Sequence, residues 1–196
     1  MTVNRTVKAD TWNTFCVPFA MTAEEIEANL GADAQVKELT GLTVDGTSFG
    51  MTFGDAASIE AGKPYMVKVA SAVSTITVYN KTITSTLDNT TVEDGSNSLT
   101  FCGNLAKMNA PMDSYIISSN KFYVVNSEVT LKGFRGYFTT NAGAGVKLME
   151  LNLDDDATAI QSIDSQAQKQ VYDLSGRRVN NAQKGIYIVN NKKVVK

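Results

Sequence analysis

Carboxylates are the groups of this chain best suited to acid–base chemistry, because the sequence contains no histidine. Histidine is the commonest general base, so its absence argues against hydrolases of the Ser-His-Asp or Cys-His type. Two acids remote in sequence can still cleave a glycosidic bond. Acids on a β-rich domain are more often solvated surface groups, so we predict a noncatalytic protein and keep a glycosidase as the least favoured alternative. The acids available for such a pair are Asp55, Glu60, Glu128 and Glu150.

Metal and phosphate sites have no clear pattern in this sequence. The three aspartates at 154–156 lack the alternating spacing and the glycine of a calcium loop. Two isolated cysteines without histidine do not make a zinc ligand set. No glycine-rich phosphate loop is present either. We therefore expect no metal and no cofactor.

Cys16 and Cys102 each lie within an apolar run. A buried cysteine behaves as a small hydrophobic residue, and we favour that interpretation for both. A disulfide between them is allowed in an oxidising compartment, but spacing in sequence does not bring two Cα atoms within bridging range. Both alternatives are open at this stage.

Aromatic side chains offer a second kind of chemistry, the binding of sugars. An exposed aromatic ring buries the apolar face of a sugar while nearby polar groups meet its hydroxyls. The grouping that most resembles such a site is Arg135 beside Phe134 and Tyr137, and Trp12 is the only tryptophan. We take Trp12, Phe134, Arg135 and Tyr137 as weak ligand-binding candidates, although core packing is the more frequent fate of each aromatic.

Short β-branched and aromatic runs recur along the chain between Gly, Asn, Asp and Ser residues. This density of strands, without alternating helices, predicts an all-β antiparallel sandwich. Asp45-Gly46 and Ser119-Asn120 are typical of tight hairpin turns, and Gly62 with Pro64 is expected to shape the turn into a strand that begins at Tyr65. The predicted strands are residues 12–17, 36–39, 42–44, 48–53, 65–69, 76–79, 99–102, 115–118, 122–125, 136–139 and 146–153.

One short helix is predicted over residues 23–30. Thr22 and Glu25 have the spacing of a capping box, and Met21 and Ile26 that of a hydrophobic staple. Gly31 is placed to end the helix in the left-handed conformation. We expect this helix to cover one end of the sheets.

The chain changes character after residue 152. We predict a β-sandwich domain at 1–152, an acidic and polar linker at 153–168 and a basic β-tail at 169–196. From residue 169 onward seven basic residues face one acidic residue, a net charge of +6, whereas the preceding residues carry −8. Alternating residues at 185–189, then Asn190-Asn191, then residues 192–196 predict a C-terminal hairpin or small meander.

The tail resembles the C-terminal sorting domain of the type IX secretion system of Bacteroidetes-type bacteria. The resemblance rests on YDLSGRRV at 172–179, KGIYIV at 184–189 and KKVVK at 192–196, the last seventh of the chain. A full sorting domain is longer than this tail. The resemblance implies export and a contact with the export machinery through Tyr172, Asp173, Gly176, Arg177, Gly185, Tyr187, Val189, Lys193 and Lys196.

The body resembles β-rich modules of Bacteroides and Prevotella surface proteins. The matching segments are WNTFCVPF at 12–19, AGKPYMV at 61–67 and GFRGYF at 133–138. Such modules have no ligand that the resemblance carries over. It implies an extracellular or outer-membrane address.

Together these patterns favour a noncatalytic secreted or cell-surface module of adhesion or scaffold type, with a carbohydrate-binding module as the alternative. A glycan or a surface protein is the expected partner. The acidic body and the lack of an aromatic stacking platform argue against nucleic acid. No apolar run approaches the roughly 20 residues that span a bilayer. A monomer is expected.

Overall fold

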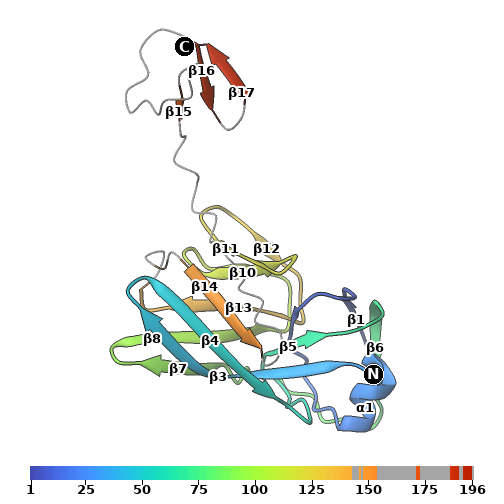
Figure 1. Cartoon of the computed structure of the whole chain (residues 1–196). Coiled ribbons are helices and arrows are strands. Elements are labelled where there is room, and N and C mark those ends of the chain that lie inside the picture. The colour runs from blue at the N-terminus through green and yellow to red at the C-terminus, as the bar shows by residue number, and fades with distance from the viewer. Residues whose placement is uncertain (143–145, 147, 154–170, 173–185, 190–191, 196) are drawn as a thin grey trace. The chain divides into compact units, whose positions relative to one another are not determined.

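The computed structural model describes residues 1–142, 146, 148–153, 171–172, 186–189 and 192–195. By its contacts the chain divides into two compact units, Met1–Ile163 and Asp164–Lys196. This division falls within the expected linker, whose residues 154–168 lie outside the described residues. Apart from one short helix, the regular elements described in the larger unit are all strands, as the sequence predicted (Figure 1).

The first large sheet has the strand order β14-β4-β3-β5-β2. Its pairs are antiparallel except at one edge, where β14 runs parallel to β4. The sequence predicted two strands at 36–39 and 42–44, but the structure joins them into β3, with a bulge between Leu39 and Gly41. The strands of this sheet are β2 (Asn13–Phe15), β3 (Gln35–Asp45), β4 (Ser48–Asp55), β5 (Tyr65–Lys68) and β14 (Leu148–Leu153).

The second large sheet has the order β11-β10-β13-β8-β7 and is antiparallel throughout. Its edge strand β7 was not expected, because TTVED contains one aliphatic residue and none of its side chains is buried. Pairing with β8, not hydrophobicity, makes this segment a strand. The strands are β7 (Thr90–Asp94), β8 (Asn97–Asn104), β10 (Tyr115–Ser118), β11 (Lys121–Val124) and β13 (Arg135–Thr140).

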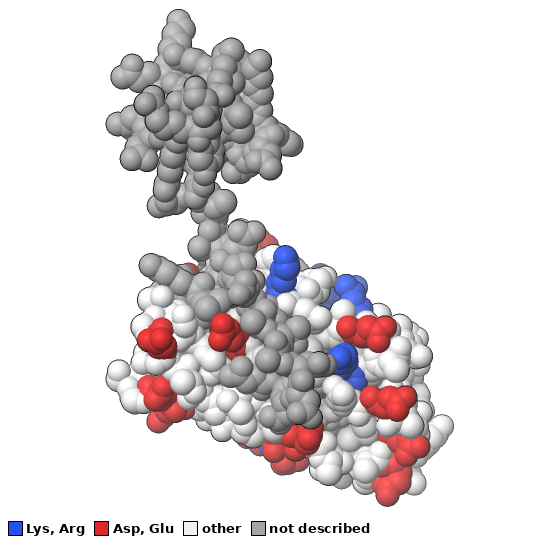
Figure 2. Space-filling view, viewed as in Figure 1, with Lys and Arg blue, Asp and Glu red and all other residues white. Residues whose placement is uncertain are grey.

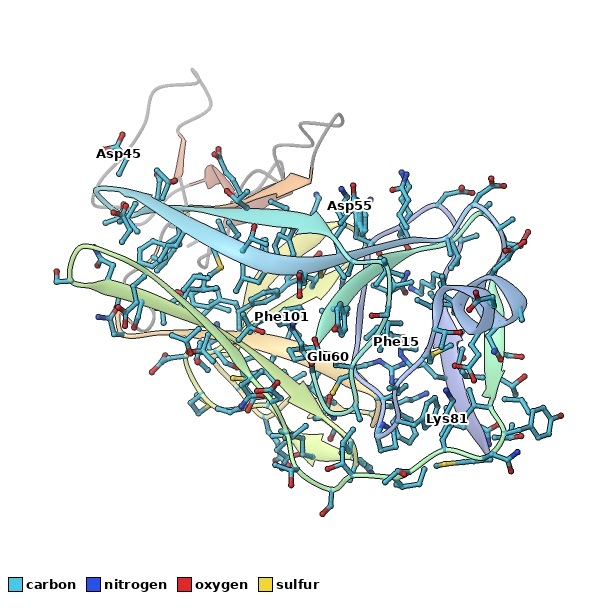
Figure 3. All side chains as sticks on the ribbon, turned by 90° about the horizontal axis from the view of Figure 1, so that it is seen from below. Phe15, Asp45, Asp55, Glu60, Lys81 and Phe101 are labelled. Carbon is cyan, nitrogen blue, oxygen red and sulfur yellow. The ribbon has the colours of Figure 1, made fainter. Side chains whose placement is uncertain are left out.

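The main core lies between these two sheets, and aromatic rings fill it. Phe101 from β8 stacks on Phe138 from β13, with ring centroids 4.3 Å apart, and meets Phe53 of the other sheet edge-on at 6.1 Å. Figure 3 shows Phe101 in the space between the ribbons of the two sheets. Each such ring pair adds about 0.5–1.5 kcal/mol beyond its area burial. The structure is therefore a sandwich in which one cluster joins both layers.

A smaller layer covers one end of the sandwich around a second hydrophobic cluster. Here β1 pairs antiparallel with β6, and the helix α1 packs beside β6. Asn29 of the helix accepts a hydrogen bond from the Thr77 amide at 2.7 Å. A further short pair, β9 with β12, lies near the second sheet. The elements are β1 (Thr2–Val7), α1 (Ala23–Leu30), β6 (Val73–Thr77), β9 (Met108–Asn109) and β12 (Thr130–Leu131).

The helix and its N-terminal cap are as predicted. Thr22 Oγ1 accepts from the Glu25 amide, and the Glu25 carboxylate accepts from the Thr22 amide at 2.9 Å. Gly31 ends the helix, but its φ of 99° and ψ of 157° differ from the expected left-handed conformation. Met21 and Ile26 are both buried in the second cluster. These signals are local, so the sequence alone was sufficient to place them.

Of the two predicted hairpin turns, one lies at the predicted residues and the other is shifted. Ser119 and Asn120 both have positive φ, 50° and 57°, as a tight two-residue turn requires. The other turn is shifted by one residue, because Asp45 pairs with Ser48 and the turn residues are Gly46 and Thr47. Glycine then occupies the first central position, with a φ of 60°.

The smaller unit contains a three-stranded antiparallel sheet of order β15-β16-β17. Its last two strands form the predicted C-terminal hairpin, with Val189 paired to Lys192. The strands are β15 (Val171–Tyr172), β16 (Ile186–Val189) and β17 (Lys192–Val195). Of the tail residues named above, Tyr172, Tyr187, Val189 and Lys193 lie on these strands, and Asp173, Gly176, Arg177, Gly185 and Lys196 lie outside the described residues.

Both cysteines are buried free thiols. Cys16 Sγ faces the Cα of Gly103, where an added Cβ would come within 2.5 Å of the sulfur. Adjacent strand residues face opposite sides, so the neighbouring Cys102 points away from Cys16. Burial raises the pKa of Cys16 to about 12 and also raises the pKa of Cys102.

We therefore expect neither thiol to react readily with iodoacetamide at neutral pH while the protein is folded. The physical reason is that the thiolate is the reactive form, and burial suppresses it. Mass spectrometry before and after unfolding in urea measures the labelling. An intramolecular disulfide formed under mild oxidant would contradict the structure.

Candidate functional site

A hollow of about 370 Å³ opens where β1, β2, the β10–β11 turn and the segment between β12 and β13 meet. Trp12 and Arg135, two of the four residues proposed from the sequence, both line it. The structure thus brings together two candidates that are far apart in the chain. Phe134 and Tyr137, the other two, do not line this hollow.

Four cationic side chains line the hollow and no carboxylate does: Arg5, Lys8, Lys132 and Arg135. None of the four forms an ion pair with any residue that the structure describes. We call this hollow the basic pocket. Figure 2 shows acidic side chains on both flanks of the visible face of the body and a few basic ones on its upper right part. A concave group of like charges with low-dielectric walls concentrates a positive potential.

Arg5 is the most buried of the four cations, with 3% of its surface exposed. Inward and outward residues alternate along β1, which places Arg5 on the buried face between Val3 and Val7. Its guanidinium donates only to backbone carbonyls. Nε reaches Phe134 at 2.8 Å, Nη2 reaches Thr14 at 2.5 Å, and Nη1 donates to the adjacent Thr6. Arg5 therefore ties β1 to β2 and to the start of β13.

Neither Arg5 nor Arg135 has a described negative charge beside it to offset the cost of burying its guanidinium group. Burial, reinforced by the charge of Arg135, lowers the pKa of Arg5 to about 9. Burial also lowers the pKa of Arg135. Both groups remain cationic at neutral pH. Buried charges in proteins are normally paired, because desolvation is costly without a counter-charge. An anion in the basic pocket would supply that counter-charge.

Asn104 fixes the segment that carries Lys132 and Arg135. This side chain is 2% exposed and comes from β8, behind the pocket. Its amide nitrogen donates to the carbonyls of Lys132 at 2.9 Å and Ala106 at 2.8 Å, and its oxygen accepts from the Arg135 amide at 3.2 Å. The backbone carbonyl of Asn104 also accepts from Phe134 at 2.8 Å. The two cations of this segment are therefore held by backbone bonds on either side of them.

Phe134 contributes to the pocket through its backbone conformation rather than through its ring. Its φ of 62° is in the left-handed region, which bulky residues rarely adopt. This conformation costs of order 1–3 kcal/mol and persists only where surrounding bonds impose it. Here Asn104 holds its amide and Arg5 holds its carbonyl, while its ring packs against the second cluster. The candidate Phe134 therefore fixes the backbone next to Arg135, and its ring does not line the pocket.

Trp12 is 7% exposed, so its ring offers little surface for stacking on a ligand. Its backbone amide donates to Asn120 of the β10–β11 turn at 3.0 Å. Lys68 Nζ lies 5.9 Å from the ring centroid, as in a cation–π contact. Trp12 supplies part of an apolar wall, not a platform.

Tyr137 belongs to a different environment. It is half-buried beside the small cluster of Ala110, Val125 and Leu131. Burial raises its pKa, with a further contribution from the nearby Cys102 thiol. The structure therefore separates Tyr137 from Trp12, although both were taken as candidates for one ligand site.

The acids considered for a glycosidase lie outside the basic pocket. Asp55 accepts from Lys37 at 2.8 Å, Glu60 from Lys63 at 3.3 Å, and Glu128 from Asn109 at 2.9 Å. Figure 3 shows Asp55 and Glu60 well apart on the body. These contacts are typical of solvated surface groups.

A second hollow of about 260 Å³ adjoins the basic pocket. The two share Thr14, Ile117, Lys132 and Arg135. A ligand bound over Arg135 can therefore extend beyond the first hollow.

Sequence reasoning missed Arg5, Lys8, Lys132 and Asn104. One signal for Arg5 was present, because Val3-Asn4-Arg5-Thr6-Val7 alternates and puts a guanidinium in line with two valines. The expected strand list omitted this segment. Asn104 gave no comparable signal, since its partners at Lys132 and Arg135 lie in another part of the sequence.

Comparison with protein-family models, with curated proteins and with solved structures finds no match. Within the described ranges, no helix has the length and apolar character needed to cross a membrane. Those residues also contain no cluster of three or more metal-ligating side chains.

Proposed function

We propose that this protein is a noncatalytic binding module of a secreted or cell-surface protein, of adhesion or scaffold type, and that its basic pocket binds an anionic group of its ligand. The observation that carries the proposal is the convergence of four cations in one hollow without a described acidic partner. The body as a whole is acidic, so this local reversal of charge selects for an anion where the rest of the surface repels one.

The arrangement favours binding over catalysis because its charged groups are cations held in fixed positions. Arg135 presents a planar group that pairs well with carboxylate, sulfate or phosphate oxygens. Arg5 is buried and bonded to backbone carbonyls, so it contributes its charge rather than a direct contact. Lys8 and Lys132 are exposed at the rim and add attraction at longer range. The secreted or surface location rests on the resemblances of tail and body. Protease treatment of intact cells tests it, since a surface protein is digested without lysis.

A titration with inorganic sulfate, followed by NMR or calorimetry, tests the anion site. We expect saturable binding that weakens with added NaCl, because the attraction is electrostatic. Arg135→Met should weaken it at least tenfold and leave the fold intact, since this side chain makes only a local bond to Gly133. Lys81→Met is the matched control, because it removes the same charge from a cation that pairs with Glu25 at 2.6 Å outside the pocket. Equal loss in both variants would contradict the proposal.

The pH dependence of sulfate affinity provides a second test. The pKa of folded Arg5, about 9, lies below its ordinary 12.5, so the folded protein loses this proton first as pH rises. Sulfate affinity should therefore fall several-fold as pH rises through about 9. Between the two pKa values the unfolded chain binds more protons, so this group's contribution to stability becomes more favourable with pH over the same range. Affinity that does not change across this interval would contradict this prediction and show that folded Arg5 keeps its proton there.

A further inference from the structure

The lining of the basic pocket contains a second set of groups that a bare anion does not use. Four hydroxyls line it without a hydrogen-bond partner among the described residues: Thr6, Thr11, Ser118 and Ser119. By contrast, the Thr14 hydroxyl accepts from Gly136 and is engaged in the fold. The free hydroxyls share the lining with the cations, and each hydroxyl can both donate and accept a hydrogen bond. A ligand that matches them carries several hydroxyls of its own.

Apolar surface completes the lining. Ile117, half-buried on β10, and the exposed part of Trp12 face the same hollow. Sugar rings combine hydroxyl edges with apolar C–H faces, and this combination matches the side chain of Ile117 and the small exposed edge of Trp12, flanked by Ser and Thr. A nucleotide base would instead require an exposed stacking ring, which the buried Trp12 does not provide.

The volume of the basic pocket also favours a saccharide over a single inorganic anion. A hollow of about 370 Å³ falls in the range of about 300–1,000 Å³ typical of small-molecule sites and is far larger than one inorganic anion needs. The adjoining hollow extends it past Arg135 and Lys132. The site is therefore suited to a ligand of more than one ring.

We infer that the basic pocket binds an acidic saccharide, with an anionic substituent against Arg135, near the buried charge of Arg5, and its hydroxyls against Thr11 and Ser118. This inference rests on the proposed anion site and deepens it. Carboxylate and sulfate substituents share the chemistry that the guanidinium groups recognise. The experiment below distinguishes between them.

Calorimetry with the full chain compares four probes: α-1,4-linked trigalacturonate, its uncharged methyl ester, a sulfated disaccharide and sodium acetate. We expect trigalacturonate or the sulfated disaccharide to bind at least tenfold more tightly than acetate and than the methyl ester. Whichever acidic sugar binds more tightly identifies the substituent. Arg135→Met should remove at least tenfold of that affinity, and Lys81→Met should leave it unchanged.

The double variant Thr11→Val, Ser118→Ala distinguishes recognition of the sugar hydroxyls from recognition of the anionic charge. Both changes are nearly isosteric and remove hydroxyls that have no described partner, so the fold should be unaffected. We expect a several-fold loss of affinity for the acidic saccharide and unchanged affinity for inorganic sulfate.

If saccharide and acetate bind alike and the double variant has no effect, the saccharide inference is wrong while the anion site stands. If the methyl ester binds as tightly as the acid, charge recognition is wrong for this ligand. If neither sulfate nor any saccharide binds, both proposals fail.

Discussion

Replacing Gly62 with alanine should destabilise the sandwich more than any other single methyl group added to a glycine of this body. Gly62 has a φ of 80°, and a Cβ built there would lie 2.2 Å from the carbonyl oxygen of Thr86. The obstacle is backbone, so it cannot rotate away. The same glycine donates to Val17 at 2.8 Å and accepts from Asp88 at 3.0 Å, which fixes its position from both sides.

The expected loss for Gly62→Ala is about 3 kcal/mol or more in the free energy of unfolding. Left-handed backbone alone costs a non-glycine residue roughly 1–2 kcal/mol, and displacing the 81–89 segment adds to that. Urea unfolding followed by circular dichroism measures it. Gly46→Ala is the matched control, because Gly46 also has a positive φ of 60° but nothing lies within 4 Å of its added Cβ. Similar losses in the two variants would show that the contact with Thr86 is not the cause.

Asn104→Ala should cost the second largest amount and should also disable the basic pocket. The substitution leaves the carbonyls of Lys132 and Ala106 and the amide of Arg135, which are part-buried, without their partner. Each unsatisfied buried group costs about 1–3 kcal/mol, partly offset where water enters. We expect a total of about 2–4 kcal/mol in the free energy of unfolding, measured as above.

Sulfate binding distinguishes the positioning role of Asn104 from a purely structural one. At a temperature where circular dichroism shows Asn104→Ala to be folded, we expect its sulfate affinity to be at least tenfold lower than that of the parent. Asn109→Ala is the control, since that side chain is exposed and bonds to Glu128 on the surface, and its effect should stay within about 0.5 kcal/mol. A folded Asn104→Ala variant with unchanged affinity would mean that Lys132 and Arg135 do not need this support.

Predictions from the sequence succeeded where neighbouring residues determine the structure. The capping box places the helix at Ala23–Leu30, and Ser119-Asn120 makes the predicted tight turn. The C-terminal hairpin follows from alternation around Asn190-Asn191. Boundaries were less accurate where pairing decides them, as at β2, which is shorter than the predicted 12–17.

The candidate site was predicted only in part, because no motif or spacing in the sequence distinguishes its four cations from other basic residues. Arg135 was singled out for its aromatic neighbours, yet its actual companions are Arg5 and Lys132, brought there by β1 and by the bonds of Asn104. Tyr137 was grouped with Arg135 because the two residues are close together in the sequence. The structure gives Tyr137 a separate cluster, since the pocket lies toward the start of β13.

The sequence by itself determined the all-β character, the capped helix, the polarity of charge between body and tail, and the lack of histidine. These properties depend on composition and on contacts between residues a few positions apart. Only the tertiary structure decided that Arg5 meets the carbonyl of Phe134, which is distant in the sequence, and that Lys8, Lys132 and Arg135 line the same pocket. Strand pairing sets such long-range meetings, and no local pattern of residues encodes which strands become neighbours.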